Sequence, residues 1–230
     1  MKKHVKLGIV LGMIFLTGNL FGQTIGVVSE KAPETKGAQT SMHLILNAVS
    51  TNVNYGKSNN AMADYKKSVL GPQVGMAFQA GITPHFSMVS EAYFIMKGGK
   101  LESNNPLTVD KRTIRLYTIE SPLLARYHFG KFYVNAGPSL AYNLTGKMKS
   151  DETSTTLSFS NSTEGFKRLD AGVQVGAGYA FRIKQKQVVL DVRYSYGLTN
   201  ISYDQEMYNR YLNINLHFMS PWKTNPFGRK

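Results

Sequence analysis

Cysteine is absent from this chain of 230 residues. Its absence excludes a disulfide scaffold, catalysis by a thiol, a metal site with cysteine ligands and a lipoprotein anchor on an N-terminal cysteine. Acidic residues are scarce: 14 Asp and Glu stand against 27 Lys and Arg, which gives a formal net charge of +13. The cations are spread along the chain without forming a basic helical patch. We therefore expect anionic lipid headgroups, rather than nucleic acid, as their counter-charge.

Long apolar runs are also missing, with one exception at the start of the chain. Residues 1–22 combine early lysines, an apolar stretch over 7–21 and the small residue Gly22, which is the layout of a secretory signal peptide. The alternative is a membrane-spanning helix, but the stretch is shorter than the roughly 20 apolar residues that such a helix needs. We predict a cleaved signal peptide over 1–22, so later membrane residence requires a closed barrel.

The most informative segment is 169–181, in which two kinds of residue alternate. The odd positions are all apolar, whereas the even positions are polar or tiny, and three of them are glycine. A period of two predicts a strand whose two faces meet different media. Small residues suit a crowded interior, and an apolar stripe ending in aromatic residues suits lipid. The pattern therefore predicts a transmembrane β-barrel with its apolar side chains outside.

The same alternation recurs along the chain and predicts about eight strands, the smallest common membrane barrel. The strands are expected at 42–49, 74–82, 86–96, 117–129, 132–144, 169–181, 188–198 and 212–218. Short connections alternate with long ones, as in outer-membrane barrels whose short turns face the periplasm. We predict an all-β fold, an antiparallel up-and-down transmembrane barrel over 42–218. A periplasmic segment over 23–41 precedes it and a basic periplasmic tail over 219–230 follows.

Aromatic side chains gather near both ends of the predicted outward faces. Rings with a polar edge prefer the headgroup region of a bilayer, so we predict two aromatic girdles. The alternative is that these rings only pack the strand ends. The predicted girdle residues are Phe86, Phe94, Tyr117, Tyr127, Phe129, Phe132, Tyr142, Phe181, Tyr194, Tyr196 and Phe218.

Ionisable residues also fall on inward-facing positions, and they have two interpretations. One is a path for ions or protons, and the other is a neutralising network that fills a narrow lumen. Acids and bases nearly balance in this set, which favours the network, because buried charges must be paired. A barrel of eight strands also has an interior only wide enough for side chains. The predicted lumen residues are Glu91, Lys97, Glu120, Arg126, Asp170, Asp191 and Arg193.

No catalytic, cofactor-binding or metal-binding residues are predicted. The outward face holds Ser90 and Ser121, but no His, Asp or Glu lies beside them to act as a base. The inward histidines are scattered and lack the carboxylate spacing of a metal site. The sequence therefore predicts a protein that is not an enzyme and that has no cofactor.

Five short motifs are distributed along the predicted barrel. They are Ser90-Glu91-Ala92-Tyr93-Phe94 leading to Lys97-Gly98-Gly99, Glu120-Ser121-Pro122-Leu123-Leu124-Ala125-Arg126-Tyr127, Ala136-Gly137-Pro138, Gly176-Ala177-Gly178-Tyr179 and Arg193-Tyr194-Ser195-Tyr196-Gly197-Leu198. Together they resemble the PorT-like outer-membrane β-barrel family, small eight-stranded barrels of the OmpA-like kind. The resemblance implies an outer-membrane barrel that usually has no assigned activity, although the founding member is linked to a secretion and gliding apparatus. Such barrels commonly stop at an aromatic residue, whereas this chain continues past Phe218. The tail is either a disordered end or a docking segment.

These observations predict a non-enzymatic outer-membrane protein with a side-chain-filled lumen. Its expected role lies in envelope structure or in interactions, including a place in a secretion or assembly complex. Expected partners are outer-membrane lipid and lipopolysaccharide, and an envelope protein that contacts the extracellular loops or the tail, with no nucleic acid. A narrow porin for small solutes is the alternative. A lipid A-modifying enzyme is more distant.

Overall fold

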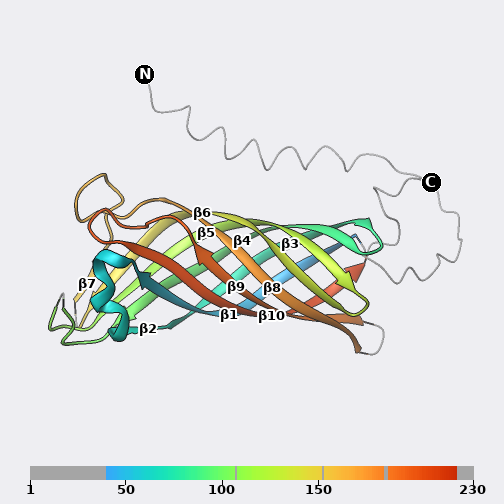
Figure 1. Ribbon diagram of the computed structural model, residues 1–230, viewed down its shortest axis with the longest axis horizontal. Coiled ribbons are helices and arrows are strands. Elements are labelled where there is room, and N and C mark those ends of the chain that lie inside the picture. The colour runs from blue at the N-terminus through green and yellow to red at the C-terminus, as the bar shows by residue number, and fades with distance from the viewer. Residues whose placement is uncertain (1–39, 107, 152, 184–185, 222–230) are drawn as a thin grey trace, which may run out of the picture. The chain divides into compact units, whose positions relative to one another are not determined.

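Eight long antiparallel strands form a closed barrel in the computed structural model (Figure 1). The structure describes residues 40–106, 108–151, 153–183 and 186–221, all of which belong to one compact unit. The predicted signal peptide, almost all of the segment 23–41 and most of the tail lie outside the described residues. The predicted fold class, an all-β up-and-down barrel, is confirmed.

The eight barrel strands are long and antiparallel, and they follow one another around the barrel in chain order. They are β1 (Ser41–Tyr55), β3 (Val69–Thr83), β4 (Phe86–Leu101), β5 (Arg112–Phe129), β6 (Phe132–Ser150), β8 (Leu169–Ile183), β9 (Lys186–Gly197) and β10 (Met207–Pro221). Three short elements lie in the connections: the 3-10 helix η2 (Lys57–Tyr65), β2 (Lys66–Lys67) and β7 (Thr153–Thr156).

The barrel closes because the first and last strands pair. The β1–β10 ladder runs from Ser41 opposite Pro221 to Tyr55 opposite Met207, and every other barrel strand pairs with its neighbours in chain order. The first and last strands pair over Ser41–His43 and again, in the same register, over Val49–Tyr55, which joins the two edges of the sheet. A strand in lipid has no water for its backbone groups, so this closure is what a membrane-spanning sheet requires.

The strands are longer than predicted, and nearly all of the extra length lies at one end. The tight turns between β3 and β4 and between β5 and β6 occur where they were expected. At the opposite end β1 continues to Tyr55 rather than 49, and β6 to Ser150 rather than 144. Beyond the apolar wall the outward positions become polar, as at Ser50, Asn52 and Asn54 of β1, so the outward apolar stripe ends while backbone pairing continues. We call the two ends of the barrel the turn end and the loop end.

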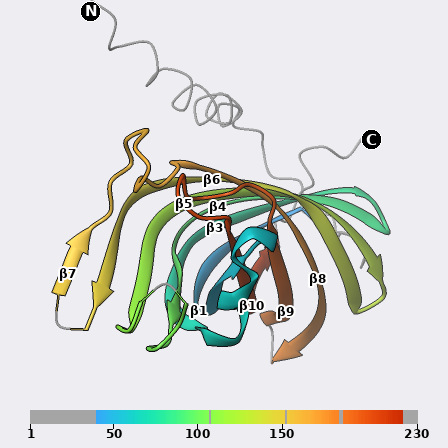
Figure 2. The same ribbon diagram turned by 60° about the vertical axis from the view of Figure 1, so that its left-hand side comes forward.

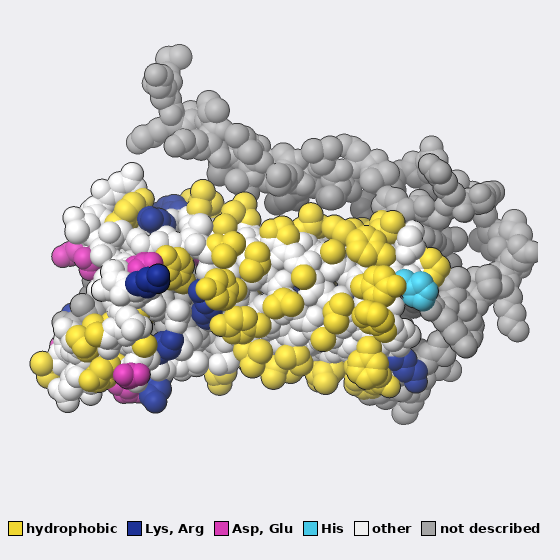
Figure 3. Space-filling view, in the orientation of Figure 1, with side chains coloured by type: hydrophobic (Ala, Val, Ile, Leu, Met, Phe, Trp, Pro, Cys, Tyr) yellow, Lys and Arg dark blue, Asp and Glu magenta, His cyan; other side chains and the backbone are white. Residues whose placement is uncertain are grey.

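The outer wall of the barrel is apolar over its central part. Figure 3 shows hydrophobic side chains spread over the wall, with charged side chains gathered mainly at the loop end, on the left. Leu46 is 74% exposed, Leu44 66% and Val175 57%. Soluble monomers rarely expose a continuous apolar area of this kind, so the wall fits a lipid environment. Among the described residues, no helix combines the length and apolar character needed to cross a membrane.

The inward-facing residues of β8 are small because atoms of other strands lie close above them. A Cβ atom on Gly178 would lie 2.2 Å from Cζ of Tyr133, and one on Gly176 would lie 2.6 Å from the carbonyl oxygen of Val192. Glycine is therefore required at these positions for close approach. The crowded interior expected from the glycines of 169–181 is what the structure contains.

Candidate functional site

The centre of the barrel is filled by polar side chains, and the ionisable ones among those predicted for the lumen come from four strands. All seven ionisable residues predicted for the lumen lie there, and each is at most 5% exposed. They are Glu91 and Lys97 on β4, Glu120 and Arg126 on β5, Asp170 on β8, and Asp191 and Arg193 on β9. Inward-facing positions of neighbouring strands face one another across a narrow lumen, which brings these residues together.

The part of this network nearer the turn end is centred on Arg193. Its guanidinium donates to both oxygens of Glu91, at 2.8 Å and 3.1 Å, and its Nη2 lies 3.2 Å from Asp191 Oδ1. Asp191 also accepts a hydrogen bond from the Tyr133 hydroxyl at 2.6 Å. Arg126 lies 3.8 Å from Asp191 and stacks 3.9 Å from the centre of the Tyr133 ring. These contacts pair two carboxylates with two guanidinium groups.

The part nearer the loop end is centred on Lys97. Its ammonium lies 2.7 Å from Glu120 Oε2 and 3.0 Å from Asp170 Oδ2. Asp170 also accepts from the Asn209 amide at 2.8 Å, and Glu120 from the Tyr211 hydroxyl at 2.7 Å. One cation thus faces two carboxylates, whose remaining charge is stabilised by neutral hydrogen-bond donors.

Gln174 connects the two parts of the network. Its amide nitrogen lies 2.8 Å from Glu120 Oε1 and from the hydroxyls of Tyr93 and Tyr211, and its amide oxygen accepts from Arg193 at 3.2 Å. Gln174 occupies an inward position of the alternating segment 169–181, so its direction could be read from the sequence. Its role could not, because a neutral amide does not stand out as charged residues do. Tyr211 was placed in a connection and its contribution was missed.

A small void lies within the network on its Lys97 side. The void beside Lys97, Ser139 and Tyr211 has a volume of about 10 Å³. A cavity of roughly that size holds one water molecule at most.

Towards the loop end, apolar residues follow the network. This loop-end apolar cluster consists of Val53, Ile114, Leu116, Leu157, Phe166, Ile201 and Met207. In the ladders Leu116 lies opposite Lys97, and Val53 opposite Asn209, so the cluster begins where the ionic network stops. Polar groups in the middle of the barrel are therefore separated from the loop end by buried hydrocarbon.

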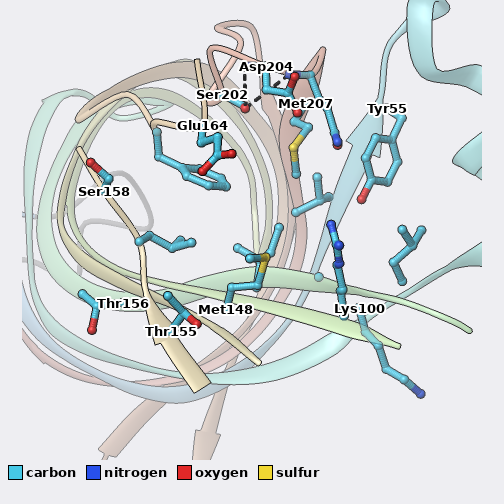
Figure 4. A pocket seen from close by; sticks show the side chains of 18 of the residues that line it. Tyr55, Lys100, Met148, Thr155, Thr156, Ser158, Glu164, Ser202, Asp204 and Met207 are labelled. Atoms are coloured by element: carbon cyan, nitrogen blue, oxygen red, sulfur yellow. Dashed lines mark hydrogen bonds between the residues drawn. The ribbon is translucent and has the colours of Figure 1, made fainter. Parts of the chain in front are cut away.

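A cavity of about 430 Å³ opens above this cluster at the loop end (Figure 4). Its floor is apolar, and its sides carry hydroxyl groups, Arg112, Glu164 and Asp204. Figure 4 shows Glu164 and Thr155 on opposite sides of the cavity. The sequence analysis did not predict this cavity, because its walls come from six strands and two connections that only the fold brings together.

The predicted girdle residues lie towards the two ends of the apolar wall. Near the turn end, Tyr127 and Phe129 are in ring contact with centroids 4.8 Å apart, and Phe86 pairs with Tyr127 across strands. Towards the loop end, Phe94 and Tyr117 stack with centroids 6.2 Å apart. Phe132, Tyr142, Tyr194 and Tyr196 are exposed on the outer wall and Phe181 is half-buried. The side chain of Phe218 lies outside the described part of the chain.

The family of the chain follows from a comparison with known protein families. The model described as "Outer membrane protein beta-barrel domain" matches residues 37–203, well over half of the chain. The chain belongs to this family. This outer membrane barrel protein therefore lies in the outer membrane, in agreement with its closed ladder and apolar wall. No curated protein matches it.

Three solved structures similar to this outer membrane barrel protein are distant in sequence. Ail, the attachment invasion locus protein of Yersinia pestis, is 10% identical with a TM-score of 0.43, over 80% of this chain and 99% of that chain. A structure of Ail with the heparin analogue sucrose octasulfate is 9% identical with a TM-score of 0.42, over 79% and 99%. Neisserial surface protein A is 10% identical with a TM-score of 0.44, over 79% and 97%.

On this outer membrane barrel protein, several serine and histidine side chains that could take part in catalysis form hydrogen bonds with other groups of the barrel. The hydroxyl of Ser121 donates to the backbone carbonyl of Glu91 at 2.9 Å. His43 bonds the hydroxyl of Ser41 at 2.8 Å, and His128 that of Ser87 at 2.9 Å. Within the described ranges, no group of three or more His, Asp or Glu side chains is arranged to hold a metal ion.

Proposed function

We propose that this protein is a non-enzymatic component of the outer membrane that acts in envelope structure or in interactions, through its loop end. The single observation that carries the proposal is the lumen filled by the Arg193 and Lys97 ion pairs. The outer wall contacts lipid and the interior is filled by side chains. The loops and the rims of the barrel therefore remain as the surfaces that can bind a partner. Because short turns of such barrels face the periplasm, the loop end is expected to face outside.

The lumen contacts support a protein that does not conduct ions. Each cation of the network lies within 4 Å of a carboxylate, and the void among them is about 10 Å³. Moving an ion through this region would require several buried ion pairs to separate, each at a cost of several kcal/mol. A narrow porin is therefore the less favoured alternative.

Cations on the outer wall near the loop end support an anionic lipid, including lipopolysaccharide, as one partner. Arg115 on β5 and Lys147 on β6 are exposed and lie directly opposite each other, and Lys149 follows on the same edge. Like charges facing each other across strands repel, and a lipid phosphate between them would relieve the repulsion. Each such interfacial cation contributes about 1 kcal/mol to binding an anionic surface.

A protein partner is supported by the resemblance to PorT-like barrels, which implies a place in a secretion or assembly complex. The loops are the first candidate contact region, and the tail 219–230 is the second. Nucleic acid is not expected, because the cations are spread over loops and turns rather than gathered in a basic helical patch.

A planar-bilayer recording tests the filled lumen. Purified protein should give no regular single-channel step. Arg193→Leu and Lys97→Leu together remove two of the cations that fill the lumen, and they serve as a comparison for leak through a loosened interior. A large and uniform step from the unaltered protein would overturn the filled-lumen proposal in favour of a porin.

Shortening the third long connection tests the interaction role. Replacing residues 150–164 with a short Gly-Ser linker should leave the barrel folded, because the ionic network lies outside this segment. It should abolish co-purification with an envelope partner. A deletion that changes no interaction and no envelope property would leave a purely structural role, and altered lipid A masses in a strain without the gene would point instead to an enzyme.

A further inference from the structure

The loop-end cavity has the features of a binding site rather than of a packing defect. Its volume of about 430 Å³ falls within the range of ligand pockets, roughly 300–1,000 Å³. Five members of the loop-end apolar cluster line it: Val53, Ile114, Leu157, Phe166 and Met207. Each of them is at most 9% exposed, so the floor is a dry surface that an apolar side chain could cover.

One wall of this cavity is formed by the exposed strand β7. Figure 2 shows β7 at the margin of the sheet with no strand drawn on its far side, and within the described residues it pairs with β6 alone. Its sequence Thr-Ser-Thr-Thr has high strand propensity and carries no Lys or Pro of the kind that blocks an edge. β7 is therefore an unprotected edge beside an apolar pocket.

The hydrogen-bond pattern shows which groups of β7 face the free edge. The Leu157 amide donates to the Gly146 carbonyl on β6 at 2.9 Å. Backbone groups alternate in direction along an antiparallel strand, so Thr155 and Thr153 also face β6, whereas Ser154 and Thr156 face away. The chain itself pairs with this edge two residues beyond Thr156, where the backbone carbonyl of Ser158 accepts a hydrogen bond from the Phe166 amide at 2.8 Å.

Charges at the cavity argue against a purely anionic ligand. Glu164 and Asp204 lie on its sides and are exposed. The Nε atom of Arg112 is buried without a hydrogen-bond partner, while Lys100 is paired with Glu102 at 2.6 Å. Figure 4 shows the Lys100 side chain pointing away from the cavity. A chain of phosphates would meet two carboxylates here, whereas a peptide brings carbonyl oxygens for Arg112 and amide or ammonium groups for the acids.

We infer that β7 and the loop-end cavity bind an extended peptide segment that carries a large apolar side chain. The peptide pairs with Ser154 and Thr156 and adds a strand to the β6–β7 ladder. Residues opposite each other on neighbouring strands project to the same face. A peptide residue opposite Thr155 therefore points to the face of Leu157, over the apolar floor. This inference rests on the proposed function and names the chemistry of its partner.

Short random peptides displayed on phage, selected against the full-length protein in lipid nanodiscs, provide the probe. Selected peptides should alternate a large apolar residue with polar ones and lack proline near it. Ser154→Pro removes a donor at the free edge but none from the β6 ladder, and Thr155→Trp fills the cavity. Each of these two substitutions should weaken the binding of the selected peptides by about tenfold or more. The matched controls Ser154→Ala and Thr153→Trp, which keep the donor and leave the cavity open, should bind normally.

Backbone amide exchange gives an independent readout. Bound peptide should slow exchange at Ser154 and Thr156. A variant that fails to fold would be recognised by an identical gel mobility before and after boiling. Peptides that bind the variants and the unaltered protein equally, or that protect other amides only, would overturn the inference. Protection of these two amides by purified lipopolysaccharide instead of peptide would assign the cavity to lipid. Loss of a co-purified partner on shortening 150–164, with no effect of either point variant, would overturn the peptide site and leave the proposed function intact.

Discussion

At the scale of single residues, stability depends on how the buried charges are paired. Arg193 is 1% exposed and carries the two-point contact to Glu91 as well as the contact to Asp191. A buried ion pair adds little net stability compared with apolar packing, but losing one partner leaves an uncompensated charge. The loss of Arg193 is therefore expected to be more damaging than the loss of any exposed cation.

Arg193→Leu should lower the free energy of unfolding by about 3–5 kcal/mol, because it leaves Glu91 without its cation and leaves Asp191 with only the 3.8 Å contact to Arg126. The measurement is urea unfolding of the protein in lipid vesicles. Adding Glu91→Gln to this variant should restore part of the loss, since the stranded charge of Glu91 is removed. Lys149→Leu on the exposed outer wall should change stability by less than about 0.5 kcal/mol. Equal effects of Arg193→Leu and Lys149→Leu would contradict the account of a buried network.

A second prediction concerns Glu206, which anchors η2 at the loop end. Hydrogen bonds from the Ser58 hydroxyl at 2.8 Å, the Tyr208 hydroxyl at 2.9 Å and the Ser58 amide at 3.2 Å lower the pKa of this carboxyl. A lowered pKa means that the anchoring is complete above the ordinary glutamate pKa of about 4.3 and is lost as the pH falls through the lower folded value. The protection of the Ser58 amide, which compares its exchange rate with that of an unfolded chain at the same pH, should fall over this acid range. Glu206→Gln should show fast exchange already at neutral pH, and a flat profile for the unaltered protein would contradict the anchoring role.

At the scale of elements, the turn end was predictable because its geometry is local. The apolar alternation stops abruptly at each tight turn, so the sequence marked the ends of β3, β5 and the starts of β4 and β6. Gly130, between β5 and β6, has a φ of 66°. Residues with a side chain pay roughly 1–2 kcal/mol in this left-handed region, and Asn pays less.

Gly130→Val should therefore destabilise the barrel by about 1–2 kcal/mol, and Gly130→Asn by less. The ranking can be measured by urea unfolding in vesicles. No atom lies within 4 Å of the position of an added Cβ, so packing does not confound the comparison. Equal stability of the valine variant and the unaltered protein would show that this turn relaxes without cost.

At the scale of the whole molecule, the fold depends on a pairing between the two ends of the chain. The β1–β10 ladder joins residues more than 150 positions apart, and no local signal encodes it. The reason to expect this pairing is indirect. A sheet in lipid must close into a barrel, because open strand edges are not tolerated there.

The closed ladder should resist detergent until it is heated. Unboiled protein is therefore expected to migrate differently from boiled protein on a denaturing gel. A chain that ends before Met207 lacks β10, so it should lose this difference. Identical mobility of the unaltered protein before and after boiling, with recovery in the soluble fraction, would contradict the closed membrane barrel.

The sequence by itself determined the barrel, its number of strands and the inward or outward direction of the side chains in the predicted parts of those strands. A period of two is a local property, and lipid on one face with a packed lumen on the other makes it visible. The inward direction of Glu91, Arg126 and Arg193 follows from that period alone. Which charge meets which does not, because partners come from strands far apart in the chain.

Only the tertiary structure decided the partners, the strand ends and the cavity. Beyond the apolar wall the outward residues are polar, so β7 and the outer parts of β1 and β6 lack the outward apolar stripe by which the strands were predicted. Gln174 and Tyr211 became central because the closed barrel brings neutral donors against Glu120. The loop-end cavity likewise exists because closure brings Val53, Leu157 and Met207 together from three separate regions of the chain. Local pattern sets the direction of a side chain, whereas closure sets its neighbours.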